Sequence, residues 1–329
     1  MSRLKENLSS DEALHDKNNL IIWQTANQRI ERAKKQPIPQ KLFGTLWYES
    51  EICFLFSDTN VGKTILALQI ANSITSGKAI KGFEMNALTQ MVIVFDFEMN
   101  DKQFEKRCSN NYKDHYCFDE KLKLATINND FIDYDDSDKQ MHNAIEKAIV
   151  GSKSKIVVID NITYLNKDTS KGDRALELMK LLKRMKSQHQ LSILVLAHCV
   201  KRDKSRPLVK DNMAGSSNLQ NFADSMFALG RGDDNTRYIK QLKSRFDSIY
   251  FGGENVIVLH IEEIDNLLQM TFDKYDDESN YLTKVSVEDK EQLANEIREY
   301  KKKYPNKSIR DIEIDLGVSK GRIQRALKE

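Results

Sequence analysis

Residues 54–64 read Phe-Leu-Phe-Ser-Asp-Thr-Asn-Val-Gly-Lys-Thr. An apolar run ends at Phe56, a polar loop follows it, and an amphipathic segment begins at Lys63. This strand–loop–helix context is the one that a phosphate-binding P-loop requires, because N–H groups of the loop and of the helix N-terminus can cradle phosphate oxygens. The predicted ATP contacts are Ser57, Asp58, Thr59, Asn60, Val61, Gly62, Lys63, Thr64 and Ile65.

Two residues of this loop carry the phosphate and metal chemistry. The ammonium group of Lys63 would reach the β- and γ-phosphates, and the hydroxyl of Thr64 would bind Mg²⁺. The motif G-x-x-x-x-G-K-[ST] starts with glycine, whereas this chain has Ser57 there. If the backbone needs a positive φ at that position, serine costs about 1 kcal/mol. A chance Gly-Lys-Thr and a domain that binds ATP without hydrolysing it are the alternatives.

Two carboxylates come at the ends of apolar runs. Glu98 follows the run 91–97, and Asp160 closes the run 155–160. Ligands of open α/β sheets bind beyond the carboxyl ends of the strands. Glu98 is therefore placed to polarise an attacking water, and Asp160 to orient Mg²⁺ through water. A solvated carboxylate at position 98 and a simple N-cap at position 160 remain open.

Short apolar runs alternate with helical stretches through residues 41–280, the predicted core domain. Because several runs are continuously apolar, we expect strands buried on both faces, in an α/β fold with a mainly parallel sheet flanked by helices. The last runs lie close together, which predicts hairpins extending one edge. The predicted strands are Ile52–Phe56, Met91–Phe97, Lys123–Ile127, Ile156–Ile159, Ser192–Ala197, Ser225–Leu229, Tyr238–Leu242 and Val256–Ile261, with helices over 63–76, 101–109, 139–150 and 173–188.

The two ends of the chain differ from this core. Residues 1–40 are polar, and we expect a helical arm there with a helix over Asn18–Ala33. Residues 286–329 have the pattern of three short helices, which predicts a separate small all-α domain.

Bulk properties restrict the setting of the protein. The 329 residues carry a net charge of +2, so any nucleic-acid contact must come from local basic patches. No apolar run approaches the about 20 residues that cross a bilayer, and the N-terminus has no signal-peptide pattern. The four cysteines show no C-x-x-C spacing. We therefore expect a cytoplasmic protein without a membrane partner or a structural metal.

In this order, these segments resemble the RecA-like ATPases of the RepA and DnaB hexameric helicase branch, in particular RepA-like ATPases of plasmids and mobile elements. The resemblance covers roughly residues 40–275 and implies a RecA-like P-loop NTPase core. It also implies that Glu98 is the catalytic base and that His198, at the end of a later strand, senses the γ-phosphate. The segments that carry it are Ser57–Thr64, Val94–Glu98, Val157–Asp160, Leu196–His198, Ala214–Ser216 and Lys240–Arg245.

The resemblance further implies that each site is completed by a neighbouring subunit of a homo-oligomer, expected to be a hexamer. A basic pair in K-x-R spacing near a late strand supplies the cations in such families. Lys243 and Arg245 match that spacing. A solvated, basic edge strand is the alternative for this pair.

A basic loop follows the strand that ends at His198. Loops in this position face the central channel of related rings, where they would track single-stranded DNA through its phosphates. A solvated surface loop is the alternative. The five basic residues of this loop are Lys201, Arg202, Lys204, Arg206 and Lys210.

The C-terminal segment has the pattern of a helix-turn-helix domain, and we expect it to be winged-helix-like. A helix over Ser308–Asp315 precedes the turn Leu316–Val318, and Ser319 would cap the helix Lys320–Lys328. Such a helix can enter the major groove of DNA, whereas a small bundle that docks on a protein would show nearly the same pattern. The side chains predicted to face DNA are Lys320, Arg322, Gln324 and Arg325.

Together these features favour a DNA-dependent, Mg²⁺-ATP-hydrolysing oligomer, a replicative-type helicase or a DNA-remodelling motor. Two other functions stay open. One is an ATP-switched DNA-binding regulator or recombinase-like filament that does not unwind DNA. The other is a pseudo-ATPase scaffold, suggested by Ser57.

Overall fold

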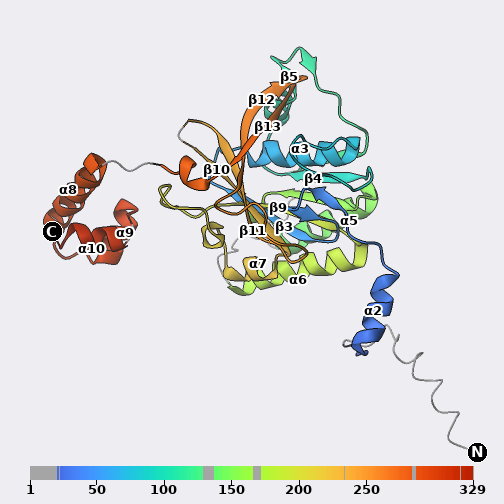
Figure 1. The fold of residues 1–329 in the computed structure, drawn as a ribbon, viewed down its shortest axis with the longest axis horizontal. Coiled ribbons are helices and arrows are strands. Elements are labelled where there is room, and N and C mark those ends of the chain that lie inside the picture. The colour runs from blue at the N-terminus through green and yellow to red at the C-terminus, as the bar shows by residue number, and fades with distance from the viewer. Residues whose placement is uncertain are drawn as a thin grey trace, which may run out of the picture. The chain divides into compact units, whose positions relative to one another are not determined.

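The structure is a computed structural model that describes residues 21, 23–128, 137–165, 172–232, 234–283, 287–318 and 320–328 (Figure 1). The chain divides into two compact units, Met1–Pro39 and Gln40–Glu329. Among the residues described, no helix combines the length and the apolar character that crossing a bilayer takes.

The first unit contains the helix α2 (Ala26–Lys34). The Thr25 hydroxyl accepts a hydrogen bond from Gln28 N at 3.1 Å, and the Gln28 side chain accepts one from Thr25 N at 2.9 Å. This capping box starts the helix at Ala26. The prediction of a helix from Asn18 is therefore wrong for residues 21 and 23–25, while residues 18–20 lie outside the described part. No α2 side chain is buried.

The second unit is built on a nine-stranded sheet in the order β13-β12-β11-β10-β3-β9-β8-β4-β7. The strands from β10 to β7 pair in parallel, and β11, β12 and β13 add an antiparallel edge. The predicted α/β class and the hairpin edge are thus confirmed. The strands are β3 (Ile52–Ser57), β4 (Val92–Asp96), β7 (Leu122–Ala125), β8 (Ile156–Asp160), β9 (Ser192–His198), β10 (Ser225–Arg231), β11 (Arg237–Lys243), β12 (Val256–Ile264) and β13 (Leu267–Asp276).

Both faces of the sheet are covered, which explains why its strands read as unbroken apolar runs. Along β3, Ile52, Phe54 and Phe56 pack into a cluster with α5 (Ser137–Ser152) and α6 (Gly172–His189). The alternate residues of β3 pack into a second cluster with α3 (Lys63–Ser76). Figure 1 shows α3 and α6 on opposite sides of the sheet.

Smaller elements complete this unit. Two short hairpins were not predicted, because strands of two or three residues leave no periodicity to read. The helix α4 follows β4, and α7 precedes β10. These elements are β1 (Lys41–Phe43), β2 (Trp47–Tyr48), α4 (Asp101–Arg107), β5 (Ser109–Asn110), β6 (Asp114–His115), η2 (Ile162–Tyr164), η3 (Lys210–Asn212), α7 (Ser217–Phe222) and η4 (Glu278–Tyr281).

Three helices follow the sheet: α8 (Val287–Lys303), α9 (Ile309–Leu316) and α10 (Lys320–Ala326). They share an apolar cluster of their own that includes Ile297, Ile312 and Ile323. Gly317 ends α9 with a φ of +64°, a left-handed conformation that glycine adopts without steric cost. The predicted cap Ser319 lies outside the described residues.

Candidate functional site

The P-loop connects β3 to α3. Gly62 has a φ of +115°, a backbone conformation that favours glycine, and a Cβ there would lie 2.6 Å from Met270 Cε, which would have to move. Ser57 is the last residue of β3 and is not among the described residues with positive φ. Its hydroxyl donates to Asp58 O at 2.7 Å. The strain that a positive φ would impose on serine does not arise here.

Lys63 is buried at the start of α3, with its ammonium group turned back to the loop. Lys63 Nζ lies 3.2 Å from Ser57 Oγ and 3.3 Å from His198 Nδ1. Burial lowers the pKa of the ammonium group, and nearby carboxylates oppose that shift. The phosphates of a nucleotide would compensate this partly desolvated cation.

The two predicted Mg²⁺ residues are in direct contact. Thr64 Oγ1 donates to Asp160 Oδ2 at 2.5 Å. Burial raises the pKa of Asp160 from 3.8 to about 6; the Thr64 hydrogen bond opposes that shift, and the Glu98 and Asp96 charges add to it. A hydroxyl and a carboxylate are the oxygen donors that Mg²⁺ takes when phosphates and waters complete its shell. The residues present therefore fit the ion.

Glu98 lies just past the end of β4, where Asp96 shapes the backbone. Asp96 Oδ1 accepts hydrogen bonds from Glu98 N at 3.1 Å and from Met99 N at 3.0 Å. Asn161 Nδ2 donates to Glu98 Oε1 and also contacts His198 Nε2 at 3.1 Å. Asn161 was not singled out from the sequence, although it directly follows Asp160. It links the carboxylate of Glu98 to the imidazole of His198.

His198 lies between Lys63 of the P-loop and Glu98 after β4. One ring nitrogen contacts Lys63 Nζ, and the other lies 3.6 Å from Glu98 Oε1. Burial, followed by the charge of Lys63, lowers the pKa of His198, which favours the neutral form of the ring. A neutral imidazole between the Lys63 ammonium group and the Glu98 carboxylate can exchange hydrogen bonds with its neighbours.

Arg107 is a second residue that the motif reading missed. It ends α4 and lines the same cavity as Lys63, Glu98 and His198. Its Nη1 atom is fully buried and has no hydrogen-bond partner among the described residues. A buried guanidinium N–H without an acceptor favours an anion in the cavity. The only sequence signal was a basic residue at the end of the helix that follows Glu98.

The cavity that these groups share has a volume of about 390 Å³. Of the predicted loop contacts, Ser57, Asp58 and Val61 do not line it. The Ser57 hydroxyl donates to Asp58 O, Asp58 pairs with Arg202, and the carbonyl of Val61 accepts from Arg237 Nε at 2.7 Å. One wall is apolar and comes partly from the β12–β13 hairpin. The full lining is Thr59, Asn60, Gly62, Lys63, Thr64, Ile65, Glu98, Arg107, His198, Ile261 and Leu268.

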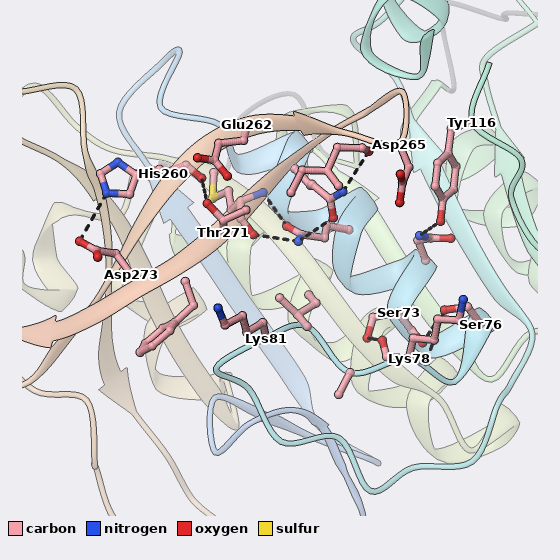
Figure 2. A pocket seen from close by; sticks show the side chains of 18 residues that line it. Ser73, Ser76, Lys78, Lys81, Tyr116, His260, Glu262, Asp265, Thr271 and Asp273 are labelled. Atoms are coloured by element: carbon pink, nitrogen blue, oxygen red, sulfur yellow. Dashed lines mark hydrogen bonds and ion pairs between the residues drawn. The ribbon is translucent and has the colours of Figure 1, made fainter. Parts of the chain in front are cut away.

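A larger cavity of about 710 Å³ lies between the second half of α3 and the β12–β13 hairpin (Figure 2). It shares no lining residue with the cavity at the P-loop. Gln69 joins its walls, because its side-chain amide exchanges two hydrogen bonds of 2.9 Å with the backbone of Met270. Figure 2 shows Lys78 and Lys81 on one side and the pair His260–Asp273 on the other. The larger cavity lacks a phosphate-binding loop, so the catalytic assignment stays with the smaller one.

Lys243 and Arg245 lie at the opposite end of the sheet from the P-loop of their own chain. Lys243 pairs with Met226, which is level with Phe54 on β3. Arg245 shares Asp224 with the backbone N–H of Ile52, at the start of β3. The two cations are therefore not brought to their own site.

The basic loop after β9 has one buried cation and four exposed ones. The side chain of Arg202 is only 6% exposed and pairs with Asp58 of the P-loop at 3.3 Å. Leu208 anchors the loop, since it is fully buried and its N–H donates to Glu278 at 2.7 Å. The four remaining cations are exposed: Lys201, Lys204, Arg206 and Lys210.

On α10, Lys320, Gln324 and Arg325 are exposed, whereas Ile323 is buried in the three-helix cluster. Arg322 is half-buried and pairs with Asp203 at 2.8 Å. Three of the four predicted DNA-facing side chains are thus open to solvent.

Two comparisons with known proteins bear on this site. A family model described as an AAA domain matches residues 24–204, more than half of the 329 residues. The matched range includes the P-loop, Glu98, Arg107, Asp160 and His198. No curated protein matches the chain.

Proposed function

This chain belongs to the AAA-domain family, a family of P-loop ATPases, and we propose that it acts as an oligomer whose ATPase activity depends on DNA. The finer form of the proposal is a hexameric ring of the RepA or DnaB type that unwinds or remodels the DNA of a plasmid or another mobile element. The observation that supports it is the separation of two sets of charged groups. One cavity gathers a base, the hydroxyl of Thr64 with Asp160 behind it, and two cations, while the Lys-x-Arg pair stands at the other end of the sheet.

Hydrolysis in this site starts from phosphates held by the P-loop N–H groups, Lys63 and Arg107. Bound Mg²⁺, held by Thr64 and through water by Asp160, would neutralise charge on the phosphates. Glu98 accepts a proton from the water whose oxygen attacks the γ-phosphorus, and ADP leaves. Asn161 holds the Glu98 carboxylate in place through a hydrogen bond. His198 couples the presence of the γ-phosphate to the position of Glu98.

The distance argument favours completion by a second copy. Asp224 ties Arg245 to the start of β3, and the P-loop follows its end. Five residue steps along β3 span about 17 Å, so Arg245 cannot reach the γ-phosphate of its own chain. A head-to-tail arrangement would bring the end that carries Lys243 and Arg245 against the nucleotide site of the next copy, and such interfaces can close into rings.

DNA contact is proposed for two exposed basic groups. Lys201, Lys204, Arg206 and Lys210 follow the strand that ends at His198, so a loop that grips DNA phosphates is coupled to the nucleotide sensor. On α10, Lys320, Gln324 and Arg325 would contact duplex DNA if the three helices act as a helix-turn-helix.

The test measures mass and ATP turnover of the full chain, with and without single-stranded DNA, and strand separation on a forked duplex. We expect turnover to rise with assembly and with DNA, and the fork to be unwound. Equal turnover per chain in a monomeric sample would contradict the oligomeric site. Slow hydrolysis with no unwinding would instead support the ATP-switched regulator or filament. Undetectable turnover with DNA present would support the scaffold.

A further inference from the structure

Three large side chains are exposed together on the loop that follows β11. Phe246, Ile249 and Tyr250 are 50%, 52% and 51% exposed, and we call them the loop patch. They come directly after Lys243 and Arg245 in the sequence. Aromatic residues are enriched in protein interfaces because they bury a large area at a small entropic cost.

The loop patch is held in one conformation by its neighbours. Asp247 accepts hydrogen bonds from the hydroxyls of Tyr48 at 3.0 Å and Tyr250 at 3.2 Å. Tyr250 N donates to the Gln241 side chain at 2.8 Å, and the ring of Phe246 packs on that of Tyr48 with centroids 4.6 Å apart. A preorganised surface loses little entropy when a partner covers it.

An apolar groove lies at the other end of the sheet, beside Glu98. Its volume is about 330 Å³, and its walls come from β4, from the end of β7 and from α5. Phe97, which directly precedes Glu98, forms part of it together with Met141 and Ala144 of α5. The Ala144 side chain is exposed.

The two surfaces match in two respects at once. On the loop patch, apolar side chains directly follow two cations in the chain. At the groove, the lining residue Phe97 directly precedes Glu98, which lines the cavity at the P-loop. They sit at opposite ends of one sheet, so a single copy cannot bring them together. A head-to-tail contact between two copies pairs apolar with apolar and cation with anion simultaneously.

We propose that the loop patch of one copy docks in the apolar groove beside Glu98 of the next copy. This inference rests on the proposed function, because that docking is what would deliver Lys243 and Arg245 to the neighbouring nucleotide. The occupant of the groove is thus a second copy of this chain, through residues 246–250.

The first experiment places a carboxylate on each surface separately. Ile249→Asp and Ala144→Asp each put a charge against apolar side chains in the contact, where it loses hydration. By sedimentation with Mg²⁺ and a non-hydrolysable ATP analogue, each variant should need at least about tenfold more protein to assemble than the wild type. Leu88→Asp, at an apolar residue that is 84% exposed elsewhere, is the matched control and should assemble normally. Normal assembly of both test variants would overturn the proposal.

Mixing the two variants is the stricter test. The Ile249→Asp chain keeps an intact groove, and the Ala144→Asp chain keeps an intact loop patch, so the mixture should form a heterodimer that neither forms alone. Failure of the mixture to dimerise, with both chains folded by circular dichroism, would overturn the docking. Loss of assembly both on deletion of residues 1–39 and in Ala144→Asp, with Ile249→Asp assembling normally, would assign the groove to the N-terminal arm and also overturn it.

Turnover in the same mixture separates the docking from the proposed function. The heterodimer holds one nucleotide site faced by the Lys243 and Arg245 of its partner copy. Recovered ATP hydrolysis that is lost again when the Ala144→Asp chain also carries Arg245→Ala would support both. A heterodimer without recovered hydrolysis would retain the docking and remove the assignment of Arg245.

Discussion

The two ends of the central sheet carry similar charged groups in opposite states of compensation. At the start of β3, Asp224 receives Lys186 at 2.8 Å, Arg245 at 3.4 Å and the N–H of Ile52 at 2.9 Å. At the other end, Lys63 Nζ contacts Ser57 and His198 but forms no ion pair with a described residue, and an N–H group of Arg107 lacks an acceptor among the same residues. Uncompensated buried charge marks the end that awaits a ligand.

The compensated end keeps a free surface of its own. The Arg245 side chain is 49% exposed, so its contact with Asp224 contributes little to stability. It can exchange that carboxylate for the phosphate of a neighbouring copy at small cost. The difference between the ends therefore suggests a division of roles, in which one end binds the nucleotide and the other end serves the next copy.

Of the substitutions that test this difference between the two ends, Arg245→Ala should have the largest effect on ATP hydrolysis. A cation supplied by a neighbour is worth about 10³–10⁵ in rate, so kcat of the oligomer should fall by about that factor. The ATP dissociation constant should stay the same, because Arg245 lies far from its own P-loop. Steady-state hydrolysis and equilibrium nucleotide binding measure the two quantities. A weakened ATP affinity with normal kcat would contradict the assignment.

Glu98→Gln should lower kcat by about 10²–10⁴, the usual contribution of a general base. ATP binding should persist, because the amide oxygen can still accept from Asn161. The check is single-turnover hydrolysis beside filter binding of ATP. Glu120→Gln, at a fully exposed carboxylate outside the cavity, serves as the control and should hydrolyse ATP normally.

Asp160→Asn should remove a pH dependence of the nucleotide-free protein. The pKa of Asp160 is about 6 in the folded chain against an ordinary 3.8, so folding favours the protonated form. Its contribution to stability is complete below pH 3.8 and is lost as the pH rises through 6. At about 1.4 kcal/mol per pKa unit, the wild type should lose about 3 kcal/mol of unfolding free energy over this range relative to the variant. Denaturant unfolding from pH 4 to 7.5 measures it; parallel curves would contradict the shift.

Arg107→Gln should weaken ATP binding by about tenfold to a hundredfold, the value of a hydrogen bond to a charged group. Arg107→Lys keeps the charge and should recover part of the affinity. Lys106→Gln, one residue earlier and exposed, is the matched control. Isothermal titration with ATP distinguishes them. Equal affinity in all three variants would mean that Arg107 does not reach the phosphates.

Ser57→Gly should have the smallest effect. Ser57 sits in an ordinary strand conformation, so restoring the glycine of the motif relieves no strain and costs about 1 kcal/mol of stability at most. Turnover should not increase. A marked gain in kcat would show that serine limits the loop after all.

The fold was readable from the sequence because burial on both faces leaves unbroken apolar runs. The ends of those runs placed Glu98, Asp160 and His198 at one edge of the sheet, and the structure brings them together around Lys63. Parallel strands bring their carboxyl ends to one edge, so the sequence alone was enough to place residues far apart in the chain at one site.

The residues that escaped the sequence reading depend on side-chain direction. Arg107 reaches the cavity from the end of a helix, and Asn161 acts through a bridge between two other side chains. No sequence motif with a fixed spacing includes either residue. Arg202 shows the converse, because it was predicted to contact DNA with the other cations of its loop, yet its side chain is buried against Asp58. Tertiary packing decided these three positions.

The most direct test of completion by a neighbouring copy mixes Glu98→Gln chains with Arg245→Ala chains. Each variant alone should be almost inactive, but an Arg245→Ala copy beside a Glu98→Gln copy holds an intact base and receives an intact arginine. In equal, random mixtures about a quarter of the sites should be complete, so hydrolysis should rise to about a quarter of the wild-type rate. Turnover of the mixture no higher than the mean of the two variants would contradict the account.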